Sequence, residues 1–362
     1  MIEIPASIDT SSLEVEVHVI GPGYGECVVI VIGKRIVIGI DSCFLAMKNT
    51  LTEPSYVERL LESVGSDAHV FWLLTHYHFD HFYGLASFLE RCGERLRSLI
   101  VPLDYLPADL VHLLALDAEK ESGSGDAYFQ ATSEYERLRN ILAKGAVSNV
   151  ESGRSGFGTW FKTDLRSLRD GRRVAVCATL DCIRPSKLAS FLGGSMSEVA
   201  KNPMSAKKNR KLGNEGSYVL HLGVGKFSGV FLGDAPAKRT KEVNWKDLLK
   251  GGGDLLLKVA HHGAKDGTSE DLLLVLGSIK DGESRKARKA LIAPFAAHGL
   301  PRKTVIELLN GSGFDVRIAG GKRKKSGQKK REIETLTRTL VEGQVQSVQE
   351  AGEAFIVERF YT

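Results

Sequence analysis

The sequence predicts an α/β fold with its chemistry at the end of a strand, and the pattern of residues 70–90 carries that prediction. Residues 70–74 form an apolar run typical of a buried strand, and residues 82–90 have the pattern of the start of a helix. The polar residues between them lie at the carboxyl end of a strand, where open α/β architectures usually place their sites. Similar strand-like runs occur at 28–32, 36–40, 229–232 and 255–259.

The polar segment 75–81 contains three histidines and an aspartate. His76 and His78 are two residues apart, so extended backbone points both rings to the same side. Asp80 and His81 follow the turn of the chain and can face a second point nearby. Imidazole and carboxylate are ligands that zinc prefers, and they also suit manganese or iron. The spacing predicts a metal site rather than a histidine-rich loop that binds nothing.

The pattern His-x-His-x-Asp-His after an apolar strand resembles the signature of the metallo-β-lactamase superfamily. The resemblance extends along most of the chain. It includes a pair of strands ending in Asp41, a strand ending in Asp234, a strand before His261 and His262, and a late His298. It implies a four-layer αββα sandwich with a helical insertion and a metal site at one edge between the sheets. In such a site Asp234 would bridge two metals.

The resemblance implies two divalent ions, zinc or manganese, with a single ion as the alternative. The implied metal ligands are His76, His78, Asp80, His81, Asp234 and His262. Asp80 would also orient a metal-bound hydroxide, which is the nucleophile of hydrolysis. His261 would face the substrate as a proton donor or anion contact, and His298 would lie near the site mouth, so Asp80, His261 and His298 are the candidate catalytic residues. The opposite assignment of His261 and His262 stays open, because adjacent residues at a strand end point to opposite faces.

The chain departs from the family pattern between residues 82 and 233, where many members carry a further histidine ligand. This stretch contains only His112 and His221, and neither ends a strand beside a motif, so both are predicted to be structural. Asp181 or Cys182, at the end of a strand-like run, could replace the missing ligand. Otherwise the first metal site has one protein ligand fewer, which favours a single ion or manganese.

Two elements narrow the resemblance to a subgroup. Residues 214–220, followed by the His-His-Gly sequence at 261–263, resemble the hydrolase domain of bacterial DNA-uptake (competence) channel proteins. The two ends of the chain and its middle insertion do not match that branch.

Length and composition set the expected domain organisation. The chain has 362 residues, of which 43% are hydrophobic and 26% charged, enough for one large domain with an appendage. Residues 1–320 are expected to form the hydrolase domain, with a helical insertion at about 104–172 that either caps the site or is a surface excursion. Residues 321–362 are expected to form a basic linker and a C-terminal extension, which would complete the sheet or contact another protein.

Charge and hydropathy indicate the expected partners and location. The net charge of +5 is concentrated in runs at 207–211, 285–289 and 322–331. Such runs suit a nucleic acid or another phosphodiester substrate, and the alternative is a solvated loop or an acidic partner. No apolar stretch approaches the roughly 20 residues that span a bilayer, and the amino terminus lacks a signal-peptide pattern. A cytoplasmic protein without membrane contact is expected, and its five cysteines are expected to be reduced thiols.

The leading functional hypothesis is metal-dependent hydrolysis of a phosphodiester, with a nuclease ahead of a small-molecule phosphodiesterase. One alternative is the hydrolysis of a lactone, thioester or β-lactam. Another is a subunit of a nucleic-acid-processing or defence complex, which would dock through the insertion or the C-terminal extension. The fold alone does not decide among these, because superfamily members share a site and differ in chemistry.

Overall fold

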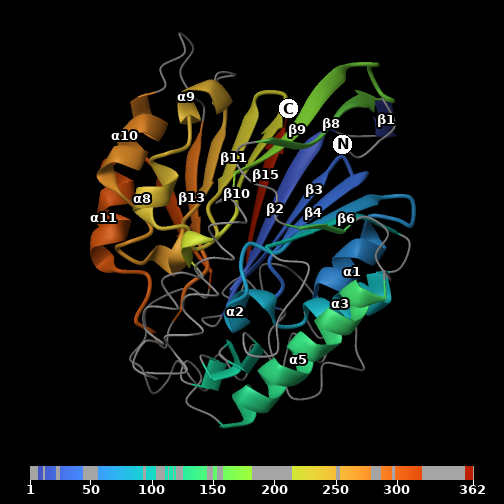
Figure 1. The fold of residues 1–362 in the computed structure, drawn as a ribbon. Coiled ribbons are helices and arrows are strands. Elements are labelled where there is room, and N and C mark those ends of the chain that lie inside the picture. Colours follow the sequence, from blue (N-terminus) through green and yellow to red (C-terminus); the bar gives the residue numbers. More distant parts are fainter. Residues whose placement is uncertain are drawn as a thin grey trace.

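Two β-sheets and their flanking helices make up the computed structural model of the chain (Figure 1). The residues that the structure describes are 7–10, 13–21, 25–43, 56–92, 95–102, 111–112, 114–116, 118–119, 125–144, 150–152, 158–181, 214–249, 253–278, 287–295, 298–319 and 355–361. Within these residues no helix combines the length and the apolar character needed to cross a membrane.

One sheet contains eight strands and the other seven. In spatial order the first contains β1 (Ser7–Thr10), β8 (Gly158–Ser167), β9 (Arg173–Asp181), β10 (Val219–Val224), β11 (Phe227–Phe231), β12 (Leu255–Lys258), β13 (Arg288–Ile292) and β14 (Asp315–Ile318). The second contains β15 (Phe355–Tyr361), β2 (Glu14–Ile20), β3 (Cys27–Ile32), β4 (Ile36–Ile40), β5 (His69–Leu73), β6 (Leu96–Val101) and β7 (Val150–Ser152). Strands β4 to β7 are parallel to one another, as are β11 to β14, so the carboxyl ends within each set meet at one edge.

Helices cover the outer face of each sheet (Figure 1). The helices on the seven-stranded sheet are α1 (Tyr56–Ser63), α2 (Phe79–Phe82), α3 (Leu85–Cys92) and α5 (Gly125–Ala143). Those beside the eight-stranded sheet are α8 (Ala237–Thr240), α9 (Trp245–Leu248), α10 (Glu270–Ser278) and α11 (Lys303–Gly311). The order helix, sheet, sheet, helix confirms the predicted four-layer sandwich.

Three apolar cores separate the four layers, and β3 shows how the sequence builds two of them. All six residues of β3 are buried. Cys27, Val29 and Val31 face the helices, whereas Val28, Ile30 and Ile32 face the opposite sheet. This is the two-residue period of a strand that is covered on both faces, which explains its continuous apolar sequence. Phe71 of β5 stacks on Phe161 of β8 across the core between the sheets, with ring centroids 4.3 Å apart.

The helical insertion predicted at 104–172 extends less far than expected. Helix α5 lies within it, but residues 150–152 and 158–167 form strands β7 and β8. The alternation in β8 of buried Phe161, Thr163 and Leu165 with exposed Lys162 and Arg166 is a strand signal that the prediction missed.

The chain's last strand lies at the edge of the seven-stranded sheet. β15 pairs antiparallel with β2, and Phe360 packs 4.6 Å from the ring of Phe227 in the other sheet. Lys289 forms an ion pair with Glu358. Of the two alternatives for the C-terminal extension, residues 355–361 complete a sheet. Residues 321–354, including the basic run at 322–331, lie outside the described residues, and the division at residue 320 stays a prediction.

Candidate metal centre

Three strand ends meet at the edge where the polar residues gather. β5 leads into the histidine segment, β11 leads to Asp234, and β12 leads to His261 and His262. A backbone hydrogen bond joins the ends of β11 and β12, where His261 donates its N–H to the carbonyl of Gly233 at 3.0 Å. Tyr218, which precedes β10, donates its N–H to the carbonyl of Thr75 after β5 at 3.1 Å. The site is thus built on strand ends fixed by the sheets, with both sheets contributing.

His76, His78 and Asp234 form the first group of candidate metal donors. Their donor atoms lie within 4.8 Å of one another, and all three side chains are buried. The Nε2 atom of His76 lies 3.1 Å from Nδ1 of His78 and 3.8 Å from Oδ2 of Asp234. Two ring nitrogens and a carboxylate oxygen therefore point at one small volume, as the two-residue spacing of the histidines predicts.

Asp80, His81 and His262 form the second group, which is equally compact and buried. The Nε2 atom of His262 lies 3.0 Å from Oδ2 of Asp80, and that of His81 lies 3.7 Å from the same oxygen. His81 Nε2 also lies 3.3 Å from Oδ1 of Asp234. Asp234 therefore turns one oxygen toward each group, which is the arrangement a bridging carboxylate needs.

The atoms between the groups fit a cation. His81 Nε2 and Asp234 Oδ1 are buried, and apart from their own 3.3 Å contact no group among the described residues meets either of them in hydrogen-bond geometry. Such unsatisfied buried atoms usually cost about 1–3 kcal/mol each. Both are metal-donor atoms on adjacent groups, so a bound ion would satisfy them.

The charge of the described cluster also fits two divalent ions. Four carboxylates are buried here, those of Glu26, Asp41, Asp80 and Asp234, against the one buried ammonium of Lys258. With neutral histidines this leaves three uncompensated negative charges, which is unfavourable in a buried site. Two divalent cations would convert that deficit to a single positive charge, which an anionic ligand could balance.

Asp41 and Thr75 contact the Nδ1 atoms of His81 and His76, on the side of each ring that faces away from the donor groups. Asp41 Oδ2 accepts a hydrogen bond from Nδ1 of His81 at 2.7 Å, and Asp41 also accepts from the N–H and hydroxyl of Thr75, each at 2.8 Å. His76 Nδ1 lies 3.0 Å from the Thr75 hydroxyl oxygen. With Nδ1 engaged in this way, each ring keeps Nε2 for the site, which is the usual outer support of a metal-binding histidine.

The protonation equilibria differ between the two groups. Burial lowers the pKa of His76 well below its usual value and that of His78 to about 4, so both rings are neutral and available as donors at pH 7. Burial also opposes protonation of His81, but the carboxylates of Asp234, Asp80 and Asp41 outweigh it and raise the pKa of His81. A cation in the second group would therefore displace a proton from His81.

His261 and His262 face different surroundings although they are adjacent. Both adopt positive φ, 49° and 52°, in the short 3-10 turn His261–Gly263. The His262 side chain is 1% exposed and points its Nε2 at Asp80, whereas the His261 side chain is 28% exposed. His261 lies with Nε2 3.8 Å from Asp234 and Nδ1 3.2 Å from Asp266. Burial works against its protonation, but these two carboxylates raise the pKa of His261 to about 9.

His298 is exposed, and the ring of Phe295 lies between it and His262 of the second donor group. Its ring centroid lies 4.6 Å from that of Phe295, which lies 5.3 Å from His262. Asp181 ends β9, but its side chain and all of Cys182 lie outside the described residues. A replacement for the missing ligand therefore stays a prediction.

The two histidines of the middle stretch belong to neither donor group. His112 is exposed and hydrogen-bonds the Tyr128 hydroxyl through Nδ1 at 2.7 Å. His221 is buried within β10, and its Nε2 has no hydrogen-bond partner in the described part of the chain. Burial lowers the pKa of His221 to about 4.

This buried ring should make stability depend on pH. As pH falls below 6.5 the unfolded chain binds a proton at His221 that the folded chain binds only near pH 4. Stability should therefore decline over that interval, by roughly 2–3 kcal/mol at pH 4.5. Denaturant unfolding at pH 7 and 4.5 should show a smaller loss for His221→Leu than for wild type. Equal losses would contradict this prediction.

Helix α5 supports the histidine segment from the side of the helical layer. The Tyr135 hydroxyl donates to the carbonyl of Tyr77, between the two histidines, at 2.6 Å, and its ring stacks on Phe82 at 4.1 Å. Glu134 accepts hydrogen bonds from the backbone N–H groups of Gly84 and Ala86, both at 3.0 Å. No local sequence pattern predicts these contacts, which join residues about 50 positions apart. Helix α5 of the insertion therefore braces the segment that carries the histidines.

Removing the Tyr135 hydroxyl tests that bracing. In Tyr135→Phe the ring can still stack, but the carbonyl of Tyr77 loses this hydrogen bond, so the free energy of unfolding should fall by about 0.5–1.5 kcal/mol. On the same helix, Tyr128→Phe removes a hydroxyl that bonds the exposed His112 and should change stability by less than about 0.5 kcal/mol. Denaturant titration of both variants makes the comparison, and equal changes would contradict a bracing role.

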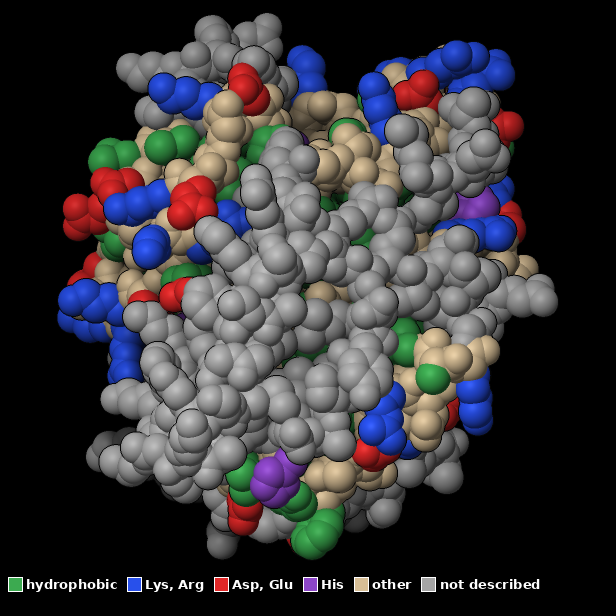
Figure 2. All heavy atoms as spheres, in the orientation of Figure 1, with side chains coloured by type: hydrophobic (Ala, Val, Ile, Leu, Met, Phe, Trp, Pro, Cys, Tyr) green, Lys and Arg blue, Asp and Glu red, His purple; other side chains and the backbone are tan. Residues whose placement is uncertain are grey.

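Basic side chains also gather away from the site. Figure 2 shows Lys and Arg at its upper right, where β8 and β9 lie in Figure 1. Arg166, Arg169, Arg172 and Arg173 are exposed there, around the turn between these strands. β9 runs from this turn to Asp181, which pairs with Val219 beside the site, so the basic turn lies at the opposite end of the sheet. Of the three predicted basic runs, only residues 287–289 are described.

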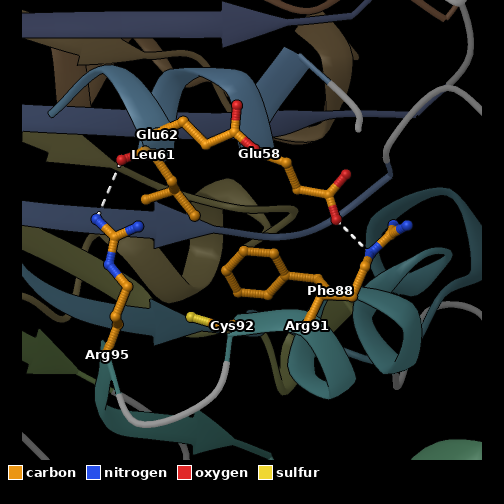
Figure 3. A pocket seen from close by; sticks show the side chains of 7 residues that line it. All are labelled: Glu58, Leu61, Glu62, Phe88, Arg91, Cys92 and Arg95. Carbon is orange, nitrogen blue, oxygen red and sulfur yellow. Dashed lines mark hydrogen bonds and ion pairs between the residues drawn. The ribbon is translucent and has the colours of Figure 1, made fainter. Parts of the chain in front are cut away.

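A cavity of about 320 Å³ lies between α1 and α3 (Figure 3). Arg95 crosses one end of it and donates to the carbonyl of Leu61 at 3.0 Å, and Arg91 pairs with Glu58 at the other end. No residue of the two donor groups lines this cavity, so it is separate from the candidate metal centre.

Comparisons with known proteins give little beyond this architecture. No protein-family model matches the chain, and no curated protein matches it. Among solved structures, a mutant of CmlA beta-hydroxylase matches with 12% sequence identity and a TM-score of 0.37, over 84% of this chain and 52% of that one. The chain thus spans about half the length of that protein. At this similarity the match assigns neither a family nor a function, and the αββα architecture rests on the layers and strand pairing described above.

Proposed function

We propose that the protein is a metal-dependent phosphodiesterase, with a nucleic acid as its leading substrate. The observation that carries the proposal is a pair of buried His/Asp groups that share Asp234, with donor atoms within 4.8 Å in each group. Donors of imidazole and carboxylate, without a thiolate, suit zinc or manganese. His76, His78 and Asp234 would hold one ion, and the second group would hold the other.

Two bound ions would lower the pKa of water and stabilise negative charge on a phosphoryl oxygen. The chain's own groups complete the reaction. Asp80 presents a carboxylate that can accept a hydrogen bond from the attacking water. His261 lies on the exposed side of Asp234, where Asp266 holds its ring at 3.2 Å. A proton on His261 is thus placed for donation to the leaving oxygen.

Charge supports a phosphodiester over a neutral ester. The chain carries a net charge of +5, and the raised pKa of His261, about 9, keeps a positive charge at the exposed side of the site. The resemblance of 214–220 and 261–263 to competence proteins points the same way. Phosphate contacts are electrostatic, so substrate binding should weaken steeply with added salt.

A nuclease assay with added metal tests the proposal. Plasmid DNA, linear DNA and RNA would be incubated with manganese, zinc or magnesium, comparing wild type with Asp80→Ala and Asp234→Ala. The matched control is Asp315→Ala, at an exposed aspartate of β14. We expect cleavage by wild type and the control, and its loss in both cluster variants. Metal bound by elemental analysis without cleavage would contradict the proposal and favour lactone, thioester or β-lactam hydrolysis, or a role as a complex subunit.

A further inference from the structure

A buried ion pair lies directly behind the second donor group. Lys258, the last residue of β12, places Nζ 2.6 Å from Oε2 of Glu26, which precedes β3. Both residues are 1% exposed, and they are 232 positions apart in the chain. Desolvation makes such a pair a poor source of stability, since an apolar pair of similar volume often serves as well. The position of this ion pair is therefore better explained by the residues that surround it.

Glu26 lies beside every residue of the second group. Its backbone N–H donates to the carbonyl of Asp80 at 3.0 Å. Its carboxylate lies with Oε2 3.4 Å from Nδ1 of His262 and with Oε1 3.9 Å from Nδ1 of His81. These ring nitrogens face away from the candidate ion. Nδ1 of His262 bonds the carbonyl of Ala293 at 3.0 Å and Nδ1 of His81 bonds Asp41 at 2.7 Å, so Glu26 places its negative charge beside both of these hydrogen bonds.

Lys258 holds that carboxylate in place. Its ammonium also donates to the carbonyl of Val259 at 3.0 Å, which anchors it to the end of the strand that carries His262. The ammonium lies 2.6 Å from Oε2 of Glu26 and occupies that oxygen. Glu26 is thereby held as an outer partner of the rings.

The first group has different outer support. His76 is backed by the hydroxyl of Thr75, and the contacts described for His78 and Asp234 include neither Glu26 nor Lys258. The ion pair is therefore specific to one of the two groups.

We infer that Glu26 and Lys258 are positioning residues that orient the donors of the second centre and set its metal affinity, leaving the first centre unaffected. The inference rests on the metal binding in the proposed function, but not on the identity of the substrate. Outer partners of metal ligands typically contribute about 10–100-fold in affinity.

Cobalt titration of the metal-free protein, followed by calorimetry and by the visible absorption of bound Co²⁺, tests the inference. Wild type should bind two equivalents. Glu26→Gln should bind the first as wild type does and the second about 10–100-fold more weakly, with altered absorption for the second alone. Lys289→Met, which removes an ion pair with Glu358 that involves no residue of either donor group, should match wild type in both steps.

The double variant Glu26→Gln with Lys258→Met covers the case in which a single variant fails to fold. It removes both charges together and leaves no unpaired buried ion. It should fold and show the same selective weakening of the second equivalent. Wild-type affinity for both equivalents, or equal weakening of both, would overturn the inference. A wild type that binds two equivalents but cleaves no phosphodiester would overturn the proposed function while leaving this inference intact.

Discussion

Replacing Asp234 by asparagine is expected to reduce phosphodiester cleavage by about 10³-fold or more. Asp234 is the one described residue with an oxygen toward each donor group, 3.3 Å from His81 and 3.8 Å from His76. An asparagine has a single oxygen and no charge, so it cannot bridge two cations. Metal polarisation supplies several kcal/mol of transition-state stabilisation, and each 1.36 kcal/mol is a factor of ten in rate.

This prediction is tested by measuring kcat and metal content on the same preparation of each variant. Asp234→Asn should lose both kcat and metal content, because the shared donor serves both groups. Asp315→Asn, at the exposed end of β14, should keep both. An Asp234→Asn enzyme within tenfold of wild type, with two metals bound, would contradict the bridging role.

Replacing His261 by alanine is expected to lower kcat on nucleic acid by about 10²–10⁴-fold, the usual contribution of a general acid. A comparison of substrates with different leaving groups then distinguishes a proton donor from a metal ligand. Bis(p-nitrophenyl) phosphate releases a phenolate that needs no proton, so its hydrolysis should fall far less. Metal content should stay that of wild type, because His262, and not His261, points Nε2 at Asp80 at 3.0 Å.

The same experiment resolves the assignment of the adjacent histidines. If His261 were instead a ligand of the first group, His261→Ala would lose metal and slow both substrates equally. His112→Ala provides the control, since His112 is an exposed histidine that bonds Tyr128 outside the centre. Equal loss on both substrates, with loss of metal, would contradict the proton-donor role.

The clustering of the donors could be predicted because it depends on short-range rules. Parallel strands bring their carboxyl ends to one edge, and a spacing of two aligns His76 with His78. The same rules gave the continuous apolar strands, such as β3, and thereby the sandwich. The separate roles of the adjacent His261 and His262 could not be assigned from the sequence, because their positive φ angles in a 3-10 turn set the direction of each ring.

The supporting contacts could not be predicted, because they join distant residues. Glu26 and Lys258 are separated by 232 positions, and Tyr135 and Tyr77 by 58. No periodicity links such pairs, and only the packed layers bring them together. Strand β8 was missed although it carries a one-sided alternation, because it lies within the stretch that was assigned as a whole to a helical insertion. Substrate identity lies beyond both sequence and fold, because related sites serve different chemistries.

The central claim is that two adjacent groups of this chain each hold a metal ion. The most direct test is a crystal structure of the metal-loaded protein, with diffraction data collected on both sides of the absorption edge of the metal. We predict two anomalous peaks, one among His76, His78 and Asp234 and the other among Asp80, His81 and His262. A fully loaded crystal with no peak at either group would contradict the claim.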